Sequence, residues 1–428
     1  MGDAAITATA LDRPLLLHQR AAVQCHALPR YTASQLASQL IEPDGDLDEP
    51  FVLTDNMTFG WSMPLTHKQN VQWLDEISAL WPDGIAEFAP NNLLGTTHNG
   101  SPRRVLAPLP TAMSEIMQWH KGHRTAFKRD PSVPAGAYAL FQMPSSRWAL
   151  FERRGDVPKP DHLPPRGAAA ASSLVSCLGE AMAAEWELKS HWAMLLVGTR
   201  GAGMLNHTDS LGVGSWHAHL TGRKWWYLSA APMALRHRAE SGRRCWEGVV
   251  EAGEVLYYGR NWWHETQCID TPTVTLSQSL IQRPHVRALV EQVVRDCALS
   301  ERTSPNLRMS GALCDAWDRC GPQLLARFAT EPAKQPPLPS WRQIVMRESA
   351  ARATAMGRRN SGKMAARRAI RKREEVLPLH YIYEALNLSL NRNHFEAHGM
   401  EIDLGEPRQH DVSPAARRVP EELHACEL

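Results

Sequence analysis

The chain has 428 residues, of which 43% are hydrophobic and 21% are charged, and its formal net charge is +2. This composition excludes a wholly disordered chain, and the length predicts two or three domains that bury a substantial core. A nearly neutral balance gives no overall footprint for nucleic acid, so any such surface has to be local.

The cysteines and the N-terminus bear on the compartment. Eight cysteines are scattered without a CxxC pair or a dense framework, which predicts free thiols in a reducing compartment. Charges at Asp3, Asp12 and Arg13 argue against a secretory signal. No apolar run reaches the length of a membrane span. We therefore expect no membrane partner and an intracellular protein, cytoplasmic or nuclear, although an organelle address stays open.

The first part of the chain predicts an extension followed by a mixed region. Apolar residues at helical spacing predict helices, whereas alternation of aromatic and small residues predicts strands. The expected elements are a helix at 32–40, a strand at 50–54, helices at 68–80 and 111–121, strands within 135–151, and a helix at 168–186.

Beyond residue 190 the pattern changes from helical to alternating. The expected strands are 192–198, 215–220, 224–229, 253–258, 264–269 and 273–280. Polar turns separate them, which is typical of a β-sandwich or barrel rather than a βαβ sheet. No glycine fingerprint links a strand to a helix, which excludes Rossmann and P-loop nucleotide sites.

After Pro284 the pattern is helical again, and the chain divides into three expected parts. These are an N-terminal extension (1–45), a β domain (46–285) and a helical C-terminal region (286–428), with helices at 286–299, 312–329 and around 381–390. The C-terminal region contains a basic arm, residues 342–373, with eleven Lys or Arg and a single acid. The arm is either a solvated helix face or a segment that binds phosphate or directs nuclear import.

Three residues of the β domain could hold a metal. His207 and Asp209 are two apart, so at a strand end they point to the same side. His264 begins another predicted strand, which a barrel can bring alongside. A His-x-Asp triplet arises about once by chance in a chain with nineteen histidines, so the prediction depends on all three residues. Two histidines and one carboxylate bind Fe(II) and leave one face of the ion open.

Lys224 opens a predicted strand on the same face as Trp226 and Leu228. It either extends to water or pairs with a ligand carboxylate inside the barrel, in a charge-assisted bond of roughly 1.5–3 kcal/mol. His217 and His219 either line the cavity or, as we prefer, are half-exposed.

Two further sets of residues carry weaker predictions. His394 and His398 form an i, i+4 pair that lacks a third metal ligand nearby. A set of tryptophans is expected to be mostly core, with Trp246 or Trp262 as candidates for the rim of a substrate mouth. The set is Trp225, Trp226, Trp246, Trp262 and Trp263.

Four blocks of the β domain resemble the JmjC/cupin-like 2-oxoglutarate oxygenases. The blocks are HTD at 207–209, WHAHLTGRKWWYL at 216–228, GEVLYY at 253–258 and WWHE at 262–265. Their order is similar to that family's HxD, G-x-K strand, G-[DE]-x-[LI]-[YF] strand and W-W/H-H. The stretch 49–61 also looks like the entry of these domains. The resemblance covers roughly 46–285, with its specific motifs in the second half.

The resemblance implies a mainly β fold with helices: a double-stranded β-helix, or jelly-roll barrel, that closes its own edges. N-terminal helices and a helical C-terminal appendage would flank it. The resemblance also implies site residues and cofactors. His207, Asp209 and His264 would be the catalytic iron ligands, Lys224 would anchor the far carboxylate of the co-substrate 2-oxoglutarate, and Tyr138 and Ser279 (or Ser277) would complete the co-substrate pocket.

The expected activity is hydroxylation of a C–H bond, or demethylation where that bond belongs to an N-methyl group. Hydroxylation of a protein side chain is preferred over histone demethylation because no reader-type domain accompanies the barrel, and the basic arm leaves hydroxylation of an RNA base as a third alternative. Met204 stands where many relatives have Thr, and an Asn often found nearby is replaced around Ser215. These departures motivate the alternative of a cupin-like metal-binding or scaffolding protein without turnover. The sequence indicates neither the specific substrate nor the oligomeric state.

Overall fold

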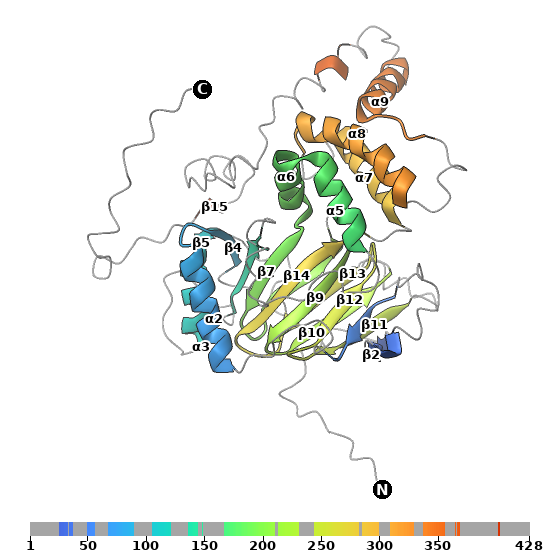
Figure 1. Cartoon of the computed structure of the whole chain (residues 1–428). Helices are drawn as coiled ribbons and strands as arrows, with labels where there is room; N and C mark the ends of the chain where they lie inside the picture. The colour runs from blue at the N-terminus through green and yellow to red at the C-terminus, as the bar shows by residue number, and fades with distance from the viewer. Residues whose placement is uncertain are drawn as a thin grey trace, which may run out of the picture.

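The computed structural model places the elements in two sheets with helices around them (Figure 1). It describes residues 25–32, 34–36, 49–55, 67–89, 105–120, 136–143, 148, 167–209, 213–230, 244–281, 285–298, 309–328, 337–355, 364, 366–368 and 401–402. The expectation of a mainly β protein with helices is confirmed.

The smaller sheet has five strands in the order β1-β11-β10-β13-β8. They are β1 His26–Ala27, β8 Gly203–His207, β10 Lys224–Ser229, β11 Cys245–Val250 and β13 Trp263–Cys268. The larger sheet has ten strands in the order β15-β5-β4-β6-β7-β14-β9-β12-β3-β2. They are β2 Arg30–Tyr31, β3 Phe51–Leu53, β4 Ile85–Ala89, β5 Val105–Pro108, β6 Tyr138–Gln142, β7 Ala193–Gly198, β9 Gly214–Thr221, β12 Val255–Tyr258, β14 Thr273–Leu280 and β15 Glu401–Ile402.

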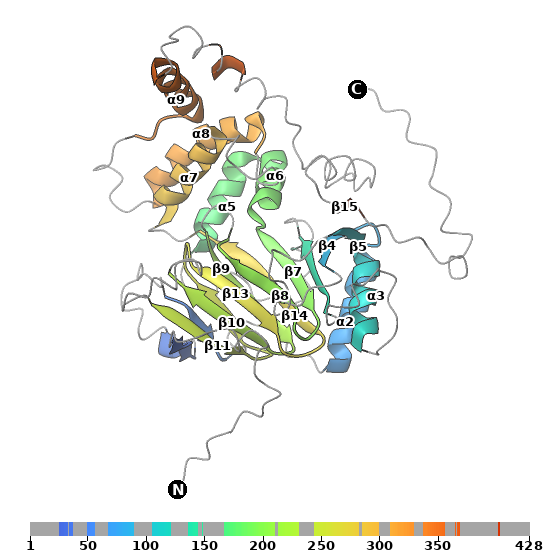
Figure 2. The same ribbon diagram turned by 180° about the vertical axis from the view of Figure 1, so that it is seen from behind.

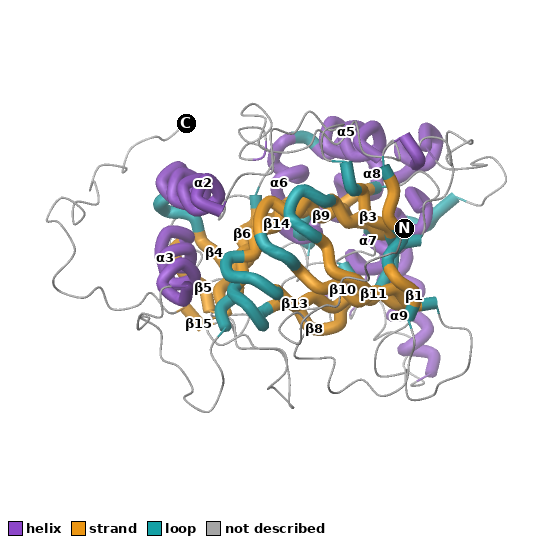
Figure 3. The backbone as a smooth tube through the Cα atoms, turned by 90° about the horizontal axis from the view of Figure 1, so that it is seen from below, coloured by secondary structure: helices purple, strands orange, loops and turns teal. Residues whose placement is uncertain are grey.

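The sheets lie face to face over their central strands (Figure 3). Trp226 and Leu228 of β10 belong to the same apolar cluster as Leu256 and Tyr258 of β12. Strand β9 is buried on both faces. Its Trp216, Ala218 and Leu220 join the core that contacts the helices, so the alternate residues face the opposite sheet.

Strand pairing does not join the two sheets in the described part of the chain. The edges therefore stay open, with β8 at one edge of the smaller sheet, and the self-closing barrel expected from the sequence is not observed. Trp246 and Trp262 pack edge to face at 5.0 Å inside a buried cluster, which confirms a core position for both.

The described helices are α2 His67–Leu80, α3 Leu109–His120, α5 Gly167–Leu178, α6 Glu180–Ser190, α7 Val286–Ala298, α8 Gly311–Phe328 and α9 Trp341–Ala355. Six of these seven helices lie where the sequence predicts helices, whereas α9 falls at the start of the basic arm, for which no helix bounds were predicted. Of the helix expected at 32–40, residues 34–36 are described and are helical. The single helix expected at 168–186 is two helices, because Gly179 adopts φ +76°, a conformation that ends α5 and favours glycine. The helix expected around 381–390 and the pair His394 and His398 lie outside the described residues.

Helices from both sides of residue 285 pack together at one end of the sheets (Figures 1 and 2). Trp186 of α6 lies 4.7 Å from Trp317 of α8 between ring centroids. The basic arm begins in α9, where Arg342 forms a two-bond ion pair with Asp315 of α8. None of the described helices has the length and hydropathy to cross a bilayer.

Three disulfides correct the expectation of free thiols. They join Cys177 of α5 to Cys320 of α8, Cys297 of α7 to Cys314 of α8, and Cys25 to Cys245 of β11. Cys268 is free and buried. The paired cysteines are 17 to 220 residues apart, so the pairing could not be predicted from short-range cysteine spacing. The argument for a reducing compartment therefore loses its basis.

Candidate metal centre

The three predicted ligands meet at the edge of the smaller sheet. His207 is the last residue of β8 and pairs directly with His264 of β13, so their rings lie across from each other at 4.1 Å. Asp209 follows two residues later. One ligand atom from each residue lies within 4.8 Å of the others. The pairing of β8 with β13 thus brings together residues that are more than fifty positions apart.

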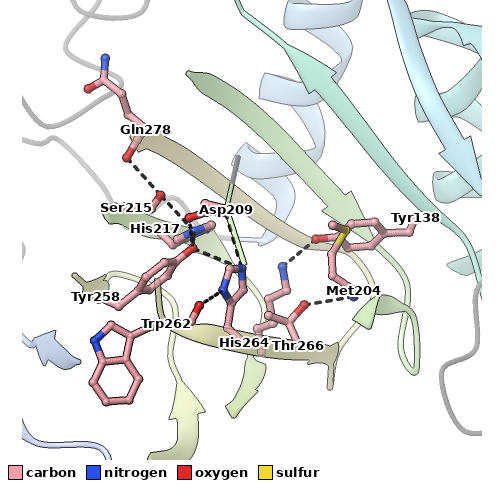
Figure 4. A network of polar contacts seen from close by, with 11 residues as sticks. Tyr138, Met204, Asp209, Ser215, His217, Tyr258, Trp262, His264, Thr266 and Gln278 are labelled. Atoms are coloured by element: carbon pink, nitrogen blue, oxygen red, sulfur yellow. Dashed lines mark hydrogen bonds and ion pairs between the residues drawn. The ribbon is translucent and has the colours of Figure 1, made fainter. Parts of the chain in front are cut away.

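His264 is held in the form that binds a metal. Its Nδ1 donates to the carbonyl of Trp262 at 3.0 Å, which leaves a lone pair on Nε2 (Figure 4). Burial lowers the pKa of His264 to about 4, although the hydrogen bond to Trp262 opposes this effect. The ring is therefore neutral at pH 7, and a neutral imidazole is the metal-binding form.

Asp209 presents one oxygen to the same point. Its Oδ1 lies 3.7 Å from Nε2 of His264, and its Oδ2 accepts a hydrogen bond of 2.8 Å from the Tyr258 hydroxyl. Burial raises the pKa of Asp209, and the neighbouring His207 opposes that rise. Metal bonds to these ligand types are about 2.0–2.2 Å long, so two ligand atoms of one ion lie at most about 4.4 Å apart. The separation of 3.7 Å between Asp209 and His264 satisfies that limit, whereas the bound of 4.8 Å on the whole set is wider than it, so a side chain would have to move by a few tenths of an ångström to bind one ion. The donor set fits Fe(II).

Lys224 lies deep between the two sheets. It is 1% exposed, and its Nζ donates to the Tyr138 hydroxyl at 2.8 Å and lies 5.3 Å from the Trp226 ring. The predicted face is confirmed, and the alternative of a lysine that extends to water is wrong. Burial lowers the pKa of Lys224 to about 8, while Cys268 opposes the shift, so the ammonium stays mostly protonated at pH 7. No carboxylate pairs with it among the described residues, which makes it suited to bind a ligand anion.

The third predicted pocket residue, Ser279, is buried on β14. It pairs with Ser215 of β9, Ser277 pairs with His217, and Thr275 pairs with His219. Burial, and then the charge of Lys224, lower the pKa of both His217 and His219. Among the described residues, the buried hydroxyl of Thr275 has no hydrogen-bond partner. Ser and Thr alternate along this strand, so the sequence alone did not single out Thr275.

The two positions that depart from the family pattern are both accounted for by packing. Met204 joins an apolar cluster that contains Tyr138, and its backbone N–H donates to the Thr266 hydroxyl at 3.2 Å. Ser215 donates to the carbonyl of Gln278 at 3.1 Å. Met204 therefore lies beside the pair of Lys224 and Tyr138 as an apolar neighbour.

Tyr258 is a functional candidate that the sequence did not identify, and His217 was named only as a residue that could line the cavity. His217 and His219 are 5% and 0% exposed, so the half-exposed position preferred for them is wrong. Tyr258 ends an apolar strand and looks like ordinary core in the sequence. One signal was available, since a buried tyrosine hydroxyl usually needs a hydrogen-bond partner.

Comparison with known proteins finds no matching family and no curated protein that matches the chain. The geometry and chemistry of the site are therefore the basis for a functional proposal.

Proposed function

We propose that the chain is an Fe(II)- and 2-oxoglutarate-dependent oxygenase with a JmjC/cupin-like, double-stranded β-helix core. One observation carries the proposal. Three ligand atoms of His207, Asp209 and His264 converge within 4.8 Å at the edge of the smaller sheet, and a buried lysine that has no carboxylate partner among the described residues lies between the two sheets. A metal site alone would fit many proteins, whereas a metal site with a separate buried cation fits a co-substrate that is both a chelator and an anion.

The residues divide the work between two ends of the site. His207, Asp209 and His264 would hold the iron, and Lys224 with Tyr138 would hold the far carboxylate of 2-oxoglutarate. Such an ion pair is stronger in a buried site because the effective dielectric constant is lower than in water. The bound metal and co-substrate would supply oxygen activation: one atom of O2 enters a substrate C–H bond, and the other enters the succinate formed as 2-oxoglutarate loses CO2.

For the substrate, we propose a protein side chain, which the enzyme would hydroxylate or N-demethylate. A nucleic acid bound through the arm at 342–373 is the second choice. Arg342, the first basic residue of that arm, is already paired with Asp315, which reduces the charge available to phosphate. The cytoplasmic or nuclear location stays a prediction. The three disulfides count against it, since such bonds persist mainly in oxidising compartments.

A metal-binding protein without turnover is the alternative. It is favoured by Met204, which places a thioether in the cluster beside Tyr138 where many relatives have a hydroxyl. Both functions keep a metal site at the three ligands, so metal binding alone does not separate them.

Turnover of 2-oxoglutarate to succinate by the purified chain with Fe(II) is the deciding experiment. We expect metal-dependent decarboxylation in the wild type and only background in His207→Ala. His26→Ala serves as the matched control, because it removes an exposed histidine of β1 that is not one of the proposed ligands. The centroid of the His26 ring lies 6.0 Å from that of Trp246. Equal turnover in wild type and His207→Ala would refute the oxygenase. Iron bound by the wild type without any decarboxylation would favour the binding protein.

A further inference from the structure

Tyr258 makes contacts that the proposed oxygenase does not require. It ends β12, is 1% exposed, and its hydroxyl lies 2.8 Å from Asp209 Oδ2, 2.9 Å from His217 Nε2 and 3.3 Å from His264 Nε2 (Figure 4). A phenol has one proton to donate and an oxygen that accepts. The three neighbours therefore determine where that proton lies.

The proton assignment follows from the neighbours. The ionised carboxylate of Asp209 only accepts, so the Tyr258 proton points to it. His264 already donates from Nδ1 to Trp262, so its Nε2 has no proton to give to the phenol. The 3.3 Å contact between the Tyr258 oxygen and His264 Nε2 therefore contains no shared proton, and the lone pair of Nε2 remains for a metal.

His217 is left as the donor to Tyr258. Because the phenol proton is committed to Asp209, His217 has to donate from Nε2 to the phenol oxygen at 2.9 Å. Ser215 lies 3.3 Å from the same nitrogen and donates its own proton to Gln278, so it is a second acceptor. Burial lowers the pKa of His217 well below its usual value, which agrees with a neutral ring. The result is a directed chain from His217 to Tyr258 to Asp209.

We propose that Tyr258 is a positioning residue that keeps Asp209 a single-oxygen metal ligand, and that His217 holds Tyr258 in place. The proposal rests on the metal site of the proposed function. With Oδ2 occupied by the phenol, Asp209 offers only Oδ1, which already faces His264 at 3.7 Å. Single-oxygen binding leaves three positions of an octahedral ion for co-substrate and oxygen, whereas two-oxygen binding would take one of them.

Packing holds the chain in this arrangement. The His217 ring stacks on Tyr258 at 5.5 Å and meets Trp226 edge-on at 4.7 Å. Both Trp226 and His217 are buried, so neither ring can rotate without displacing a neighbour. Tyr258 is therefore fixed before any metal arrives, as expected of groups that orient a ligand from outside the coordination sphere.

Binding of Co(II) to the full chain tests the proposal with a readout other than activity. We expect Tyr258→Phe to weaken Co(II) roughly 10- to 100-fold, the usual loss for an outer-shell partner of a ligand. We also expect its visible Co(II) spectrum to change as Asp209 turns to offer both oxygens. Tyr257→Phe is the matched control. It removes a hydroxyl from the adjacent residue, whose ring packs on Phe51 at 4.7 Å, and should leave affinity and spectrum unchanged.

Variants of His217 test the second half of the chain. His217→Leu should weaken Co(II) less than Tyr258→Phe, and His217→Gln should restore the affinity because its amide nitrogen can donate from the position of Nε2. Adding His217→Leu to Tyr258→Phe should cause no further loss, because His217 acts through Tyr258. Thermal unfolding of each variant shows whether it is folded, and the rescue by Gln tests the idea even if the Phe variant is unstable.

The outcomes separate this inference from the proposed function. A wild type that binds no Co(II) overturns both. A wild type that binds Co(II) with the same affinity and spectrum as Tyr258→Phe overturns only the role of Tyr258. A visible tyrosinate band with Fe(III) that is absent from Tyr258→Phe would make Tyr258 a direct ligand, and that result too would overturn the positioning role.

Discussion

Glu185 is a buried carboxylate and Asp209 a partly buried one, and their surroundings differ. Glu185 of α6 is 0% exposed, and both of its oxygens accept from Ser310 at the start of α8, from the backbone N–H at 2.6 Å and the hydroxyl at 2.7 Å. Asp209 has a hydrogen-bond donor for one oxygen among the described residues, and its other oxygen faces a nitrogen lone pair.

The difference distinguishes a structural carboxylate from a ligand. At α8, each oxygen of Glu185 accepts a hydrogen bond from Ser310, whose hydroxyl also caps the helix, so the carboxylate joins α8 to α6. At the candidate metal centre a carboxylate oxygen and a nitrogen lone pair face each other at 3.7 Å, an arrangement that a bound cation would stabilise. Incomplete satisfaction, rather than burial, therefore indicates function here.

Asp209→Asn gives the largest expected effect. We expect Co(II) affinity to fall by more than about 100-fold, beyond the usual cost of losing an outer-shell partner. The metal-free variant should be at least as stable as the wild type at pH 7. Because burial raises the pKa of Asp209, the folded chain binds a proton more readily than the unfolded chain, so wild-type stability falls as pH rises past the usual range of Asp.

Thermal unfolding of the metal-free proteins from pH 4 to 8 measures this effect. The fall in stability with rising pH that is due to Asp209 should be absent from Asp209→Asn. A marked loss of stability in metal-free Asp209→Asn would place Asp209 with Glu185 as a structural carboxylate.

Lys224→Met should have the next largest effect. Loss of a charge-assisted hydrogen bond of about 1.5–3 kcal/mol predicts a roughly 10- to 150-fold weaker binding of 2-oxoglutarate, with Co(II) affinity retained. In the wild type, the pKa of about 8 predicts that 2-oxoglutarate binding weakens as pH rises above 8, since the ammonium loses its proton. Calorimetric titration at several pH values checks both. Flat affinity between pH 7 and 9.5 would contradict the anchor role.

Glu185→Leu should affect only stability. It leaves two buried donors of Ser310 without an acceptor, at a cost of about 1–3 kcal/mol each in the free energy of unfolding. Denaturant unfolding without reductant measures the loss. Co(II) affinity should not change, and a change in it would show that the two regions are coupled.

Ser310→Ala should have the smallest effect. It removes the hydroxyl that accepts from the backbone N–H of Leu313 at 3.1 Å, and losing such a cap costs about 1 kcal/mol. The same hydroxyl donates to one oxygen of Glu185 at 2.7 Å, and leaving that oxygen without its donor costs about 1–3 kcal/mol more. The backbone N–H of Ser310 still satisfies one oxygen of Glu185. A loss as large as that of Glu185→Leu would mean that the hydroxyl, rather than the backbone, satisfies the carboxylate.

Strands of the two sheets could be predicted from the sequence where their side chains alternate. Strands that form only because they pair with a neighbouring strand could not. Alternation of aromatic and apolar residues indicated β9, β10 and β14. The sequence of β8 shows no such alternation, and its strand form depends on pairing with β13. Gly203 permits that pairing, because a Cβ there would lie 1.9 Å from the carbonyl oxygen of Thr266. Such a constraint is tertiary and leaves no local pattern.

The site shows the same limit. The candidate roles of His207, Asp209, Lys224 and His264 could be predicted because these residue types, in this order along the chain, have few functions in common. The contribution of Tyr258 was not, since the direction of a buried ring and the position of its proton depend on partners from β9 and β13. The disulfides were unreadable for a related reason, as six scattered cysteines allow many pairings.

The bond between Cys177 and Cys320 also makes the centre of the molecule a covalent ring. The ring contains strands β7 to β14 and all three proposed metal ligands. A protease site inserted in 231–243 would put His207 and Asp209 on one fragment and His264 on the other. Both this bond and the one between Cys25 and Cys245 would still connect the fragments. A cut chain should therefore migrate as one molecule until reductant is added, with its proposed metal ligands shared between two polypeptides.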